Sequence, residues 1–331
     1  MRVTVIGAGS WGTALAIHAA ALGHDVRLWA RESDLVAEMR ETKRNLRYLP
    51  EGRWSENLTP HDDMREALAD AEVVVLSIPL QFVRSLLQQY GALVPACYCV
   101  GTAKGIETAT GKLEHEIVHE VLPGLDMTRY AALSGPTLAA EVALGMPTSA
   151  VVASNDEATR KILQQALSSE KLRLYRSADV LGVEFAGAMK NVIALAAGMV
   201  DGMGYGANTK GTLITRGLAE LARLGEALGG ARKTFMGLSG LGDLTTTCMS
   251  PRSRNRSCGE FIGRGDSLAV ALEKTGQVAE GVWTARAALD LGRKHGVSVP
   301  ITEGVCAVLE GTVSAKDAVR GLMERQLKEE D

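Results

Sequence analysis

The sequence predicts an α/β domain with a doubly wound sheet, followed by an all-α domain. A β-branched run at residues 3–6 stops at a glycine, and a helical pattern begins at once. Continuous apolar runs at 72–79 and 97–102 are typical of parallel strands that are covered on both faces. After residue 177 the pattern is helical throughout. We therefore expect two domains, residues 1–177 and 178–331, as a chain of this length allows.

The turn after the first strand carries three glycines, Gly7, Gly9 and Gly12, in the spacing G-x-G-x-x-G. The first glycine allows a tight turn, the second lets backbone amides approach a pyrophosphate, and the third lets the helix pack on the strand. The start of the helix adds unpaired N–H groups. This arrangement predicts a Rossmann-type dinucleotide site. A glycine-rich turn without a ligand is the alternative.

The end of the second strand indicates which dinucleotide binds. An NAD-binding domain places an Asp or Glu here, on the ribose 2′-hydroxyl. In this chain the strand at 26–29 runs into Ala30 and Arg31, and Glu32 follows. An arginine here holds a 2′-phosphate, so Arg31 favours NADP. Because Glu32 follows directly, NAD is not excluded as the cofactor. The alternative to a cofactor-binding Arg31 is a solvated surface arginine.

The remaining elements of the first domain bring two further features to the sheet edge. Residues 34–70 are expected to form a helix and loops, and strands are expected at 130–134, 149–153 and 172–175. Lys104 follows the strand at 97–102, where ligands of open α/β sheets bind, so it is a candidate for contacting an anion. A merely solvated lysine is the alternative. Pro136 and Thr137 suit the first turn of the next helix.

Residues 115–119 read H-E-x-x-H, the spacing of a zinc-binding helix. The run lies between two predicted sheet strands, and no third ligand is evident downstream. We therefore expect an amphipathic helix with Leu113, Ile117 and Val121 facing inward, and no metal. A zinc peptidase that uses His115 and His119 is the outside alternative.

The predicted helix at 179–200 is apolar on all sides, which is typical of a buried central helix. Lys190 lies within it. Burying an ammonium group is costly unless the group is paired, and desolvation moves its pKa towards the range useful for proton transfer. Lys190 is therefore a candidate acid/base, with a lysine that reaches the surface as the alternative.

The segment 250–257 alternates three arginines with small polar residues. A planar guanidinium group binds two phosphate oxygens, and hydroxyl and amide groups bind the rest, so the segment favours a phosphate monoester. A solvated basic loop is the alternative.

Composition excludes several classes of protein. A formal net charge of -3 argues against a general nucleic-acid binder, and an aromatic content of 4% argues against stacking platforms for single strands. Five cysteines without a C-x-x-C pair indicate reduced thiols in a cytoplasmic protein. The first strand leaves no room for a signal peptide, and the apolar run at 192–200 is too short for stable membrane insertion. The oligomeric state is left open, and a homodimer is compatible with the sequence.

Six segments, taken in order, resemble the bacterial-type NAD(P)-dependent glycerol-3-phosphate dehydrogenases. They are residues 7–16, 103–107, 133–136, 188–191, 238–244 and 253–256. The resemblance implies reversible reduction of dihydroxyacetone phosphate to sn-glycerol 3-phosphate for glycerophospholipid synthesis, with NADP or NAD as cofactor. It also implies a Rossmann domain and a helical domain, as in 6-phosphogluconate dehydrogenase, with the site in the cleft between them.

The resemblance also assigns residues, with Lys190 as the proton-transferring group and Asp243 and Lys104 beside it in catalysis. The turn motif itself gives Gly7, Gly9 and Gly12 as cofactor contacts. The further cofactor contacts that the resemblance implies are Ser10, Trp11, Arg31, Lys104, Ala139, Arg254, Val278 and Glu280. The implied substrate contacts are Lys104, Gly135, Thr137, Lys190, Asp243, Ser253, Arg254 and Asn255.

Two other functions stay open at this point. A related two-domain dehydrogenase acting on a β-hydroxy acid would need a clamp for a carboxylate, whereas the segment at 253–256 suits a phosphate. A non-catalytic redox sensor would bind NADP without turnover and would need neither Lys190 nor Asp243.

Overall fold

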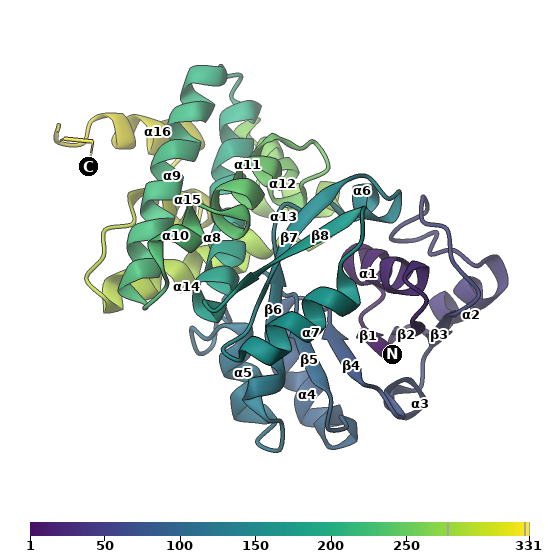
Figure 1. Ribbon diagram of the computed structural model, residues 1–331. Coiled ribbons are helices and arrows are strands. Elements are labelled where there is room, and N and C mark those ends of the chain that lie inside the picture. The colour runs from purple at the N-terminus through teal and green to yellow at the C-terminus, as the bar shows by residue number, and fades with distance from the viewer. Residues whose placement is uncertain (277, 328, 331) are drawn as a thin grey trace. The chain divides into compact units, whose positions relative to one another are not determined.

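The computed structural model describes residues 1–276, 278–327 and 329–330, and the chain forms two compact units. Unit 1 comprises Met1–Lys104 and Lys112–Glu184, and unit 2 comprises Gly105–Gly111 and Phe185–Asp331. The strands of unit 1 run from purple to teal in Figure 1, and the later helices of unit 2 run from green to yellow.

Unit 1 is built on an eight-stranded sheet with the order β3-β2-β1-β4-β5-β6-β7-β8 (Figure 1). The first six strands along the chain are parallel, β7 is antiparallel to β6, and β8 is parallel to β7. The strands are β1 (Arg2–Ile6), β2 (Asp25–Trp29), β3 (Leu58–His61), β4 (Val73–Leu76), β5 (Tyr98–Gly101), β6 (Tyr130–Ser134), β7 (Thr148–Ala153) and β8 (Leu172–Ser177). Because β1 lies between β2 and β4, the chain winds in both directions from it, which confirms the doubly wound sheet.

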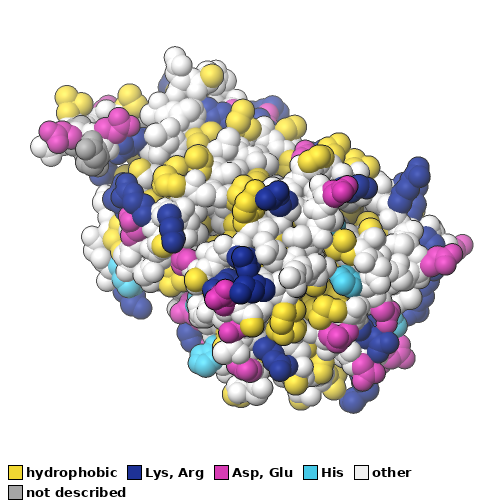
Figure 2. Space-filling model, viewed as in Figure 1, with side chains coloured by type: hydrophobic (Ala, Val, Ile, Leu, Met, Phe, Trp, Pro, Cys, Tyr) yellow, Lys and Arg dark blue, Asp and Glu magenta, His cyan; other side chains and the backbone are white. Residues whose placement is uncertain are grey.

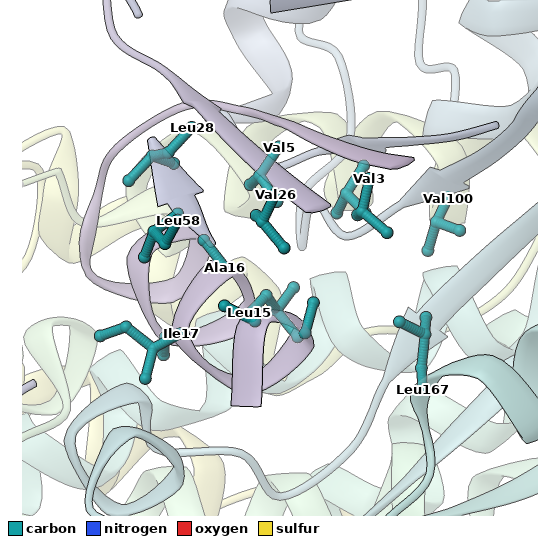
Figure 3. Packing of buried hydrophobic residues seen from close by; sticks show 14 of the residues in the cluster. Val3, Val5, Leu15, Ala16, Ile17, Val26, Leu28, Leu58, Val100 and Leu167 are labelled. Carbon is teal, nitrogen blue, oxygen red and sulfur yellow. The ribbon is translucent and has the colours of Figure 1, made fainter. Parts of the chain in front are cut away.

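Helices cover both faces of this sheet. Alternate residues of a strand point to opposite faces, so Val3 and Val5 join one buried cluster and Ile6 joins the other. The first cluster includes residues of α1 (Ser10–Ala21), α2 (Ser33–Thr42), α6 (Ala139–Ala143) and α7 (Glu157–Leu167). The second includes residues of α3 (Met64–Leu68), α4 (Val83–Tyr90) and α5 (Glu114–Val121). Figure 3 shows Leu15 and Ala16 of α1 close to the strand residues Val5 and Val26.

One strand is missing from the sequence prediction. Residues 34–70 are expected to be helix and loops, but β3 pairs with β2 inside this range. The strand has only four residues and includes Pro60, which cannot donate a ladder hydrogen bond. It is tolerated because β3 is an edge strand with a partner on one side only. A strand this short and polar has no periodicity from which it could be predicted.

Unit 2 is helical, as the sequence predicts. Its helices are α8 (Val180–Gly202, which begins in unit 1), α9 (Ala207–Ala227), α10 (Arg232–Phe235), α11 (Asp243–Met249), α12 (Arg254–Gly263), α13 (Leu268–Thr275), α14 (Glu280–Lys294), α15 (Pro300–Leu309) and α16 (Ala315–Met323). Among the described residues, α8 alone is long and apolar enough to cross a membrane. However, 94% of its most apolar stretch is buried inside the protein, as in the core helix of a soluble enzyme.

Two glycines let α8 and α12 approach until their backbones touch. A Cβ on Gly198 of α8 would overlap the carbonyl oxygen of Arg256, and a Cβ on Gly259 of α12 would overlap that of Leu195. Because neither helix can move away without losing this packing, α12 is held at a fixed distance from α8. The contact positions the start of α12, which carries Ser253 as its N-cap.

A buried carboxylate joins α9 to α15. Glu220 is 1% exposed, and its two oxygens accept hydrogen bonds from Ile301 N at 2.8 Å, Thr302 N at 2.9 Å and Thr302 Oγ1 at 2.7 Å. Burial raises the pKa of Glu220, and these hydrogen bonds act in the opposite direction. The carboxylate therefore caps the first turn of α15, where unpaired N–H groups favour an anion.

Replacing Glu220 with alanine should lower the free energy of unfolding. At least one buried N–H group would lose its acceptor, which costs about 1–3 kcal/mol. Chemical denaturation measures the loss. The matched control is Glu226→Ala on the same helix, where the carboxylate forms an exposed salt bridge with Arg232 at 3.5 Å, and such a pair contributes about 0–1 kcal/mol to the free energy of unfolding. Equal losses in both variants would contradict the capping role.

The surface carries both signs of charge. Figure 2 shows Lys and Arg side chains among Asp and Glu side chains on the face that it draws. The five cysteines are all buried and free, as expected for reduced thiols.

Candidate active site

The glycine turn between β1 and α1 has the geometry that a dinucleotide requires. Gly7 has φ +112°, and a Cβ there would overlap the carbonyl oxygen of Ser77. A Cβ on Gly12 would overlap the carbonyl oxygen of Gly7. In contrast, a Cβ on Gly9 would meet nothing within 4 Å, so the backbone is open at this point. Tight packing at the first and third glycines and open space at the second fit a pyrophosphate at the start of α1.

The first turn of α1 presents Ser10 and Trp11 at the same place. The Ser10 hydroxyl donates to the carbonyl oxygen of Tyr48 at 2.8 Å. Trp11 is half-buried, and its indole Nε1 is a buried donor without a hydrogen-bond partner among the described residues. Ala139 is the first residue of α6, which packs against α1, and both Trp11 and Ala139 contact the same core cluster. The structure therefore brings these three candidate cofactor contacts to one end of unit 1.

Arg31 follows β2 by two residues and is highly accessible. Its side chain is 82% exposed, and its guanidinium lies 3.4 Å from the Glu32 carboxylate. An exposed ion pair of this kind contributes little, so the guanidinium can turn to a stronger anion. The position fits a 2′-phosphate, and Glu32 beside it fits a 2′-hydroxyl.

Lys104, Gly135 and Thr137 meet at the ends of β5 and β6. The Lys104 Nζ donates to the carbonyl oxygen of Gly135 at 3.1 Å, and the Thr137 hydroxyl donates to the same oxygen at 3.1 Å. Gly135 has φ +150°, and a Cβ there would overlap Ala150. Lys104 lies 31 residues before Gly135 in the sequence, yet unit 1 brings it and Thr137 within hydrogen-bond distance of the Gly135 carbonyl group.

In unit 2, Lys190 forms a buried ion pair with Asp243. The side chains are 8% and 2% exposed, and Lys190 Nζ donates to Asp243 Oδ1. Thr247, one turn beyond Asp243 on α11, accepts a second bond from Lys190 Nζ at 2.9 Å and donates to Asp243 Oδ1 at 3.2 Å. A buried ammonium requires such pairing. The interpretation of Lys190 as a lysine that reaches the surface is therefore wrong, because its side chain is buried and held by two partners.

Sequence reasoning missed Thr247 and Asn191. The Asn191 Oδ1 accepts a bond from Asn255 Nδ2 at 2.9 Å, and the Asn255 Oδ1 accepts one from Gly281 N at 2.9 Å. These two hydrogen bonds connect the start of α14 to α12 and to Asn191, the residue next to Lys190. Val278 lies two residues before α14. The i, i+4 spacing of Asp243 and Thr247 was a usable signal, because it places both side chains on one helix face.

The arginines of residues 252–256 have different environments. Arg256 forms ion pairs with Asp201 at 2.6 Å and Glu260 at 3.2 Å, so its charge is balanced within unit 2. Arg254 is the exposed first residue of α12, and it forms no salt bridge in the described part of the chain. The N-cap hydroxyl of Ser253 accepts from Arg256 N at 3.2 Å. Arg254 is therefore the arginine best placed to bind a phosphate, next to the N-terminus of a helix.

The H-E-x-x-H run lies in α5, and its apolar residues face inward. Leu113 and Ile117 are buried and Val121 is half-buried, as the amphipathic interpretation predicts. The His115 Nδ1 pairs with the Glu184 carboxylate at 2.7 Å, whereas His119 is exposed. The described residues contain no group of three or more His, Cys, Asp or Glu side chains that could hold a metal ion.

The comparisons with known proteins agree along the whole chain. The family models described as the N-terminus and the C-terminus of NAD-dependent glycerol-3-phosphate dehydrogenase match residues 2–160 and 179–320. The glycerol-3-phosphate dehydrogenase [NAD(P)+] of Syntrophotalea carbinolica is 47% identical, over 100% of this chain and 99% of its own. The chain belongs to the NAD-dependent glycerol-3-phosphate dehydrogenase family. This membership confirms the resemblance that the six sequence segments indicate.

Other relatives and solved structures support this assignment. The enzyme of the same name from Corynebacterium glutamicum is 46% identical and covers 100% of both chains. The crystal structure of the Coxiella burnetii glycerol-3-phosphate dehydrogenase has a TM-score of 0.93 and 37% identity, and covers 98% of this chain and 99% of that one. As a member of the family, the chain is an oxidoreductase that acts on a CH–OH group with NAD or NADP as acceptor.

Proposed function

We propose that this member of the family catalyses the reversible reduction of dihydroxyacetone phosphate to sn-glycerol 3-phosphate with Lys190 as general acid and base. The buried pair of Lys190 and Asp243 carries the proposal, because it is a proton donor held in a fixed position. When bound, NAD(P)H supplies the hydride that reduces the C2 carbonyl. Negative charge then develops on the C2 oxygen, and the Lys190 ammonium donates a proton to it. In the oxidative direction neutral Lys190 takes the proton back.

Asp243 and Thr247 keep the Lys190 Nζ in place for this transfer. Both accept hydrogen bonds from the Nζ, so the ammonium group is held at a defined position. A positioned general acid contributes about 10²–10⁴-fold to the rate.

The substrate phosphate is assigned to Arg254, Ser253 and Asn255. The Ser253 oxygen accepts a backbone bond, which leaves its hydroxyl proton for the phosphate. In unit 1, Lys104, Gly135 and Thr137 are assigned to the substrate as well, with Lys104 also contacting the cofactor. An ammonium and a hydroxyl that share one carbonyl acceptor suit an oxygen-rich ligand.

The cofactor is assigned mainly to unit 1. Its contacts there are Gly7, Gly9, Ser10, Trp11, Gly12, Arg31, Lys104 and Ala139, and in unit 2 they are Arg254, Val278 and Glu280. Residues 1–177 then act as the cofactor domain and residues 178–331 as the substrate and catalytic domain. We further assign the enzyme to the cytoplasm, where its product supplies the backbone of glycerophospholipids, and a homodimer is compatible with this role.

One assay tests the central proposal. The absorbance of NADPH and of NADH is followed separately in the presence of dihydroxyacetone phosphate. Oxidation of either cofactor supports the proposal, and oxidation of neither refutes it. A β-hydroxy acid run in parallel, in the oxidative direction with NADP or NAD, distinguishes the related dehydrogenases. Cofactor binding without turnover would favour a redox sensor.

Arg31→Glu should shift the cofactor preference from NADPH towards NADH. The substitution removes a cation from the 2′-phosphate and adds a carboxylate that accepts a bond from a 2′-hydroxyl. The ratio of kcat/KM for the two cofactors measures the shift, and the loss of one charge-assisted hydrogen bond predicts a change of at least about tenfold. Arg44→Glu, at an exposed arginine further along the chain, is the control. An unchanged ratio would show that Arg31 is an ordinary surface residue.

A further inference from the structure

Unit 1 contains a buried polar cluster that the reaction described above does not use. Its centre is Glu184 in the first turns of α8, which is buried. The carboxylate accepts hydrogen bonds from the Tyr130 hydroxyl at 2.6 Å, from His115 Nδ1 at 2.7 Å and from the His115 backbone N at 3.2 Å. The cluster includes the first histidine of the H-E-x-x-H run.

A second carboxylate connects this cluster to the segment that carries Lys104. Glu114 is 1% exposed, and its Oε2 accepts a hydrogen bond from Ala103 N at 2.8 Å. Ala103 directly precedes Lys104. A Cβ on Gly101 would overlap both the Tyr130 hydroxyl and the Glu114 carboxylate, so the two groups converge on the end of β5.

Apolar side chains could fill this part of the core with a smaller free-energy penalty for burial than carboxylates. Burying carboxylates is unfavourable, and a well-packed apolar replacement is often neutral or stabilising. The neighbouring residues Leu113 and Ile117 are buried and apolar, so helix α5 does not otherwise need polar groups on this face. A polar cluster in such a place indicates a requirement for a defined geometry.

The cluster holds two buried carboxylates, Glu114 and Glu184, and His115 pairs with Glu184. Burial alone would lower the pKa of His115, but the hydrogen bond and the charge of Glu184 together raise it. Burial is the main cause that raises the pKa values of Tyr130 and Cys99, followed by the charge of Glu184 for Tyr130 and by Cys97 for Cys99, and both groups therefore stay neutral. The titratable groups that face the cluster are Glu114, His115 and Glu116 from α5, Cys99 from β5, Tyr130 from β6 and Glu184 from α8.

We infer that Glu114 is a positioning residue for the reaction, which fixes the backbone from which Lys104 reaches the carbonyl oxygen of Gly135. The carboxylate of Glu184 holds Tyr130 and the first turn of α5, and thereby holds Glu114 against Ala103 N. The inference rests on the proposed role of Lys104 in binding cofactor and substrate. Without Glu114 the Thr102–Ala103 peptide loses this hydrogen bond, the backbone before Lys104 is less constrained, and the Lys104 Nζ leaves its place.

The test compares substitutions at Glu114 in the whole enzyme. Glu114→Asp shortens the side chain and withdraws the carboxylate from Ala103 N without removing the charge. Glu114→Gln keeps an oxygen that accepts the same bond. We expect kcat/KM for dihydroxyacetone phosphate to fall at least about tenfold in Glu114→Asp, since small displacements of positioning groups are costly, and to be largely restored in Glu114→Gln. Glu120→Ala, on the exposed side of the same helix, is the matched control and should leave kcat/KM unchanged.

Combination with Lys104→Ala shows whether the effect passes through Lys104. In the Lys104→Ala background, Glu114→Asp should cause less than about a twofold further loss, because coupled residues are not additive. Wild-type kinetics in folded Glu114→Asp, or an equal loss in both backgrounds, would overturn the inference while leaving the role of Lys104 intact. Unchanged kinetics in Lys104→Ala alone would instead refute the proposed role of Lys104, and the inference with it. Thermal melting of each variant confirms that it is folded.

Discussion

Replacing Lys190 with alanine should lower kcat by about 10²–10⁴-fold while the affinity for NADPH stays near that of the unaltered enzyme. The substitution removes the proton donor for the developing C2 oxyanion, and a positioned general acid is worth this factor. The cofactor contacts that we propose do not include Lys190. Steady-state kinetics with dihydroxyacetone phosphate measure kcat, and fluorescence titration measures NADPH binding.

Two further variants separate chemistry from folding. Lys190→Ala leaves the buried Asp243 carboxylate without its cation, which destabilises a protein by about 3–5 kcal/mol. Lys190→Arg keeps a cation beside Asp243, but a guanidinium does not release its proton at neutral pH, so this variant should also be nearly inactive. Lys161→Ala, which removes an exposed lysine paired with Glu157, serves as the surface control. Substantial turnover in folded Lys190→Ala would exclude Lys190 as the acid.

Replacing Arg254 with alanine should raise the KM for dihydroxyacetone phosphate roughly ten- to hundredfold. A charge-assisted hydrogen bond to a phosphate is worth about 1.5–3 kcal/mol, and 1.4 kcal/mol corresponds to a factor of ten. Since Arg254 is exposed and outside any salt bridge in the described residues, its loss should change the free energy of unfolding little.

The neighbouring arginines provide the controls. Arg252→Ala removes another exposed charge two residues away and should change KM much less, because Arg252 precedes the helix and its N-terminal amides. Arg256→Ala should instead lower stability, since it leaves the Asp201 carboxylate with Lys210 as its remaining ion-pair partner among the described residues. Equal KM values for Arg254→Ala and Arg252→Ala would show that the segment acts only through its net charge.

Much of the fold was accessible from local sequence patterns. The strand β1 is a β-branched run, β4 and β5 are continuous apolar runs, and both faces of the sheet are covered, as such apolar runs predict. The strand β3 was missed because four residues with a proline at a sheet edge have no distinctive period. Glycine spacing predicts the turn at Gly7–Gly12, because the constraint acts between residues a few positions apart.

The polar partners of the site residues were harder to predict from the sequence. The sequence singled out Lys190 because a lysine in an apolar helix requires a partner, but it did not reveal that Thr247 completes the pair with Asp243. The link from Asn191 through Asn255 to Gly281 was also missed, since amide side chains of this kind are common and lack any spacing rule.

Sequence patterns alone were enough to predict the dinucleotide turn, every strand of the sheet except β3 and, through six short motifs, the family. These features depend on residues that are close together in the chain, and local sterics and periodicity encode them. Other features could be seen only once the chain was folded: Lys190 is buried and paired, Arg256 forms ion pairs while Arg254 forms none among the described residues, and Glu114 accepts a hydrogen bond from the segment before Lys104. Each of these contacts joins residues that packing brings together. The packing free energy comes from many contacts throughout the core, so no short stretch of sequence predicts it.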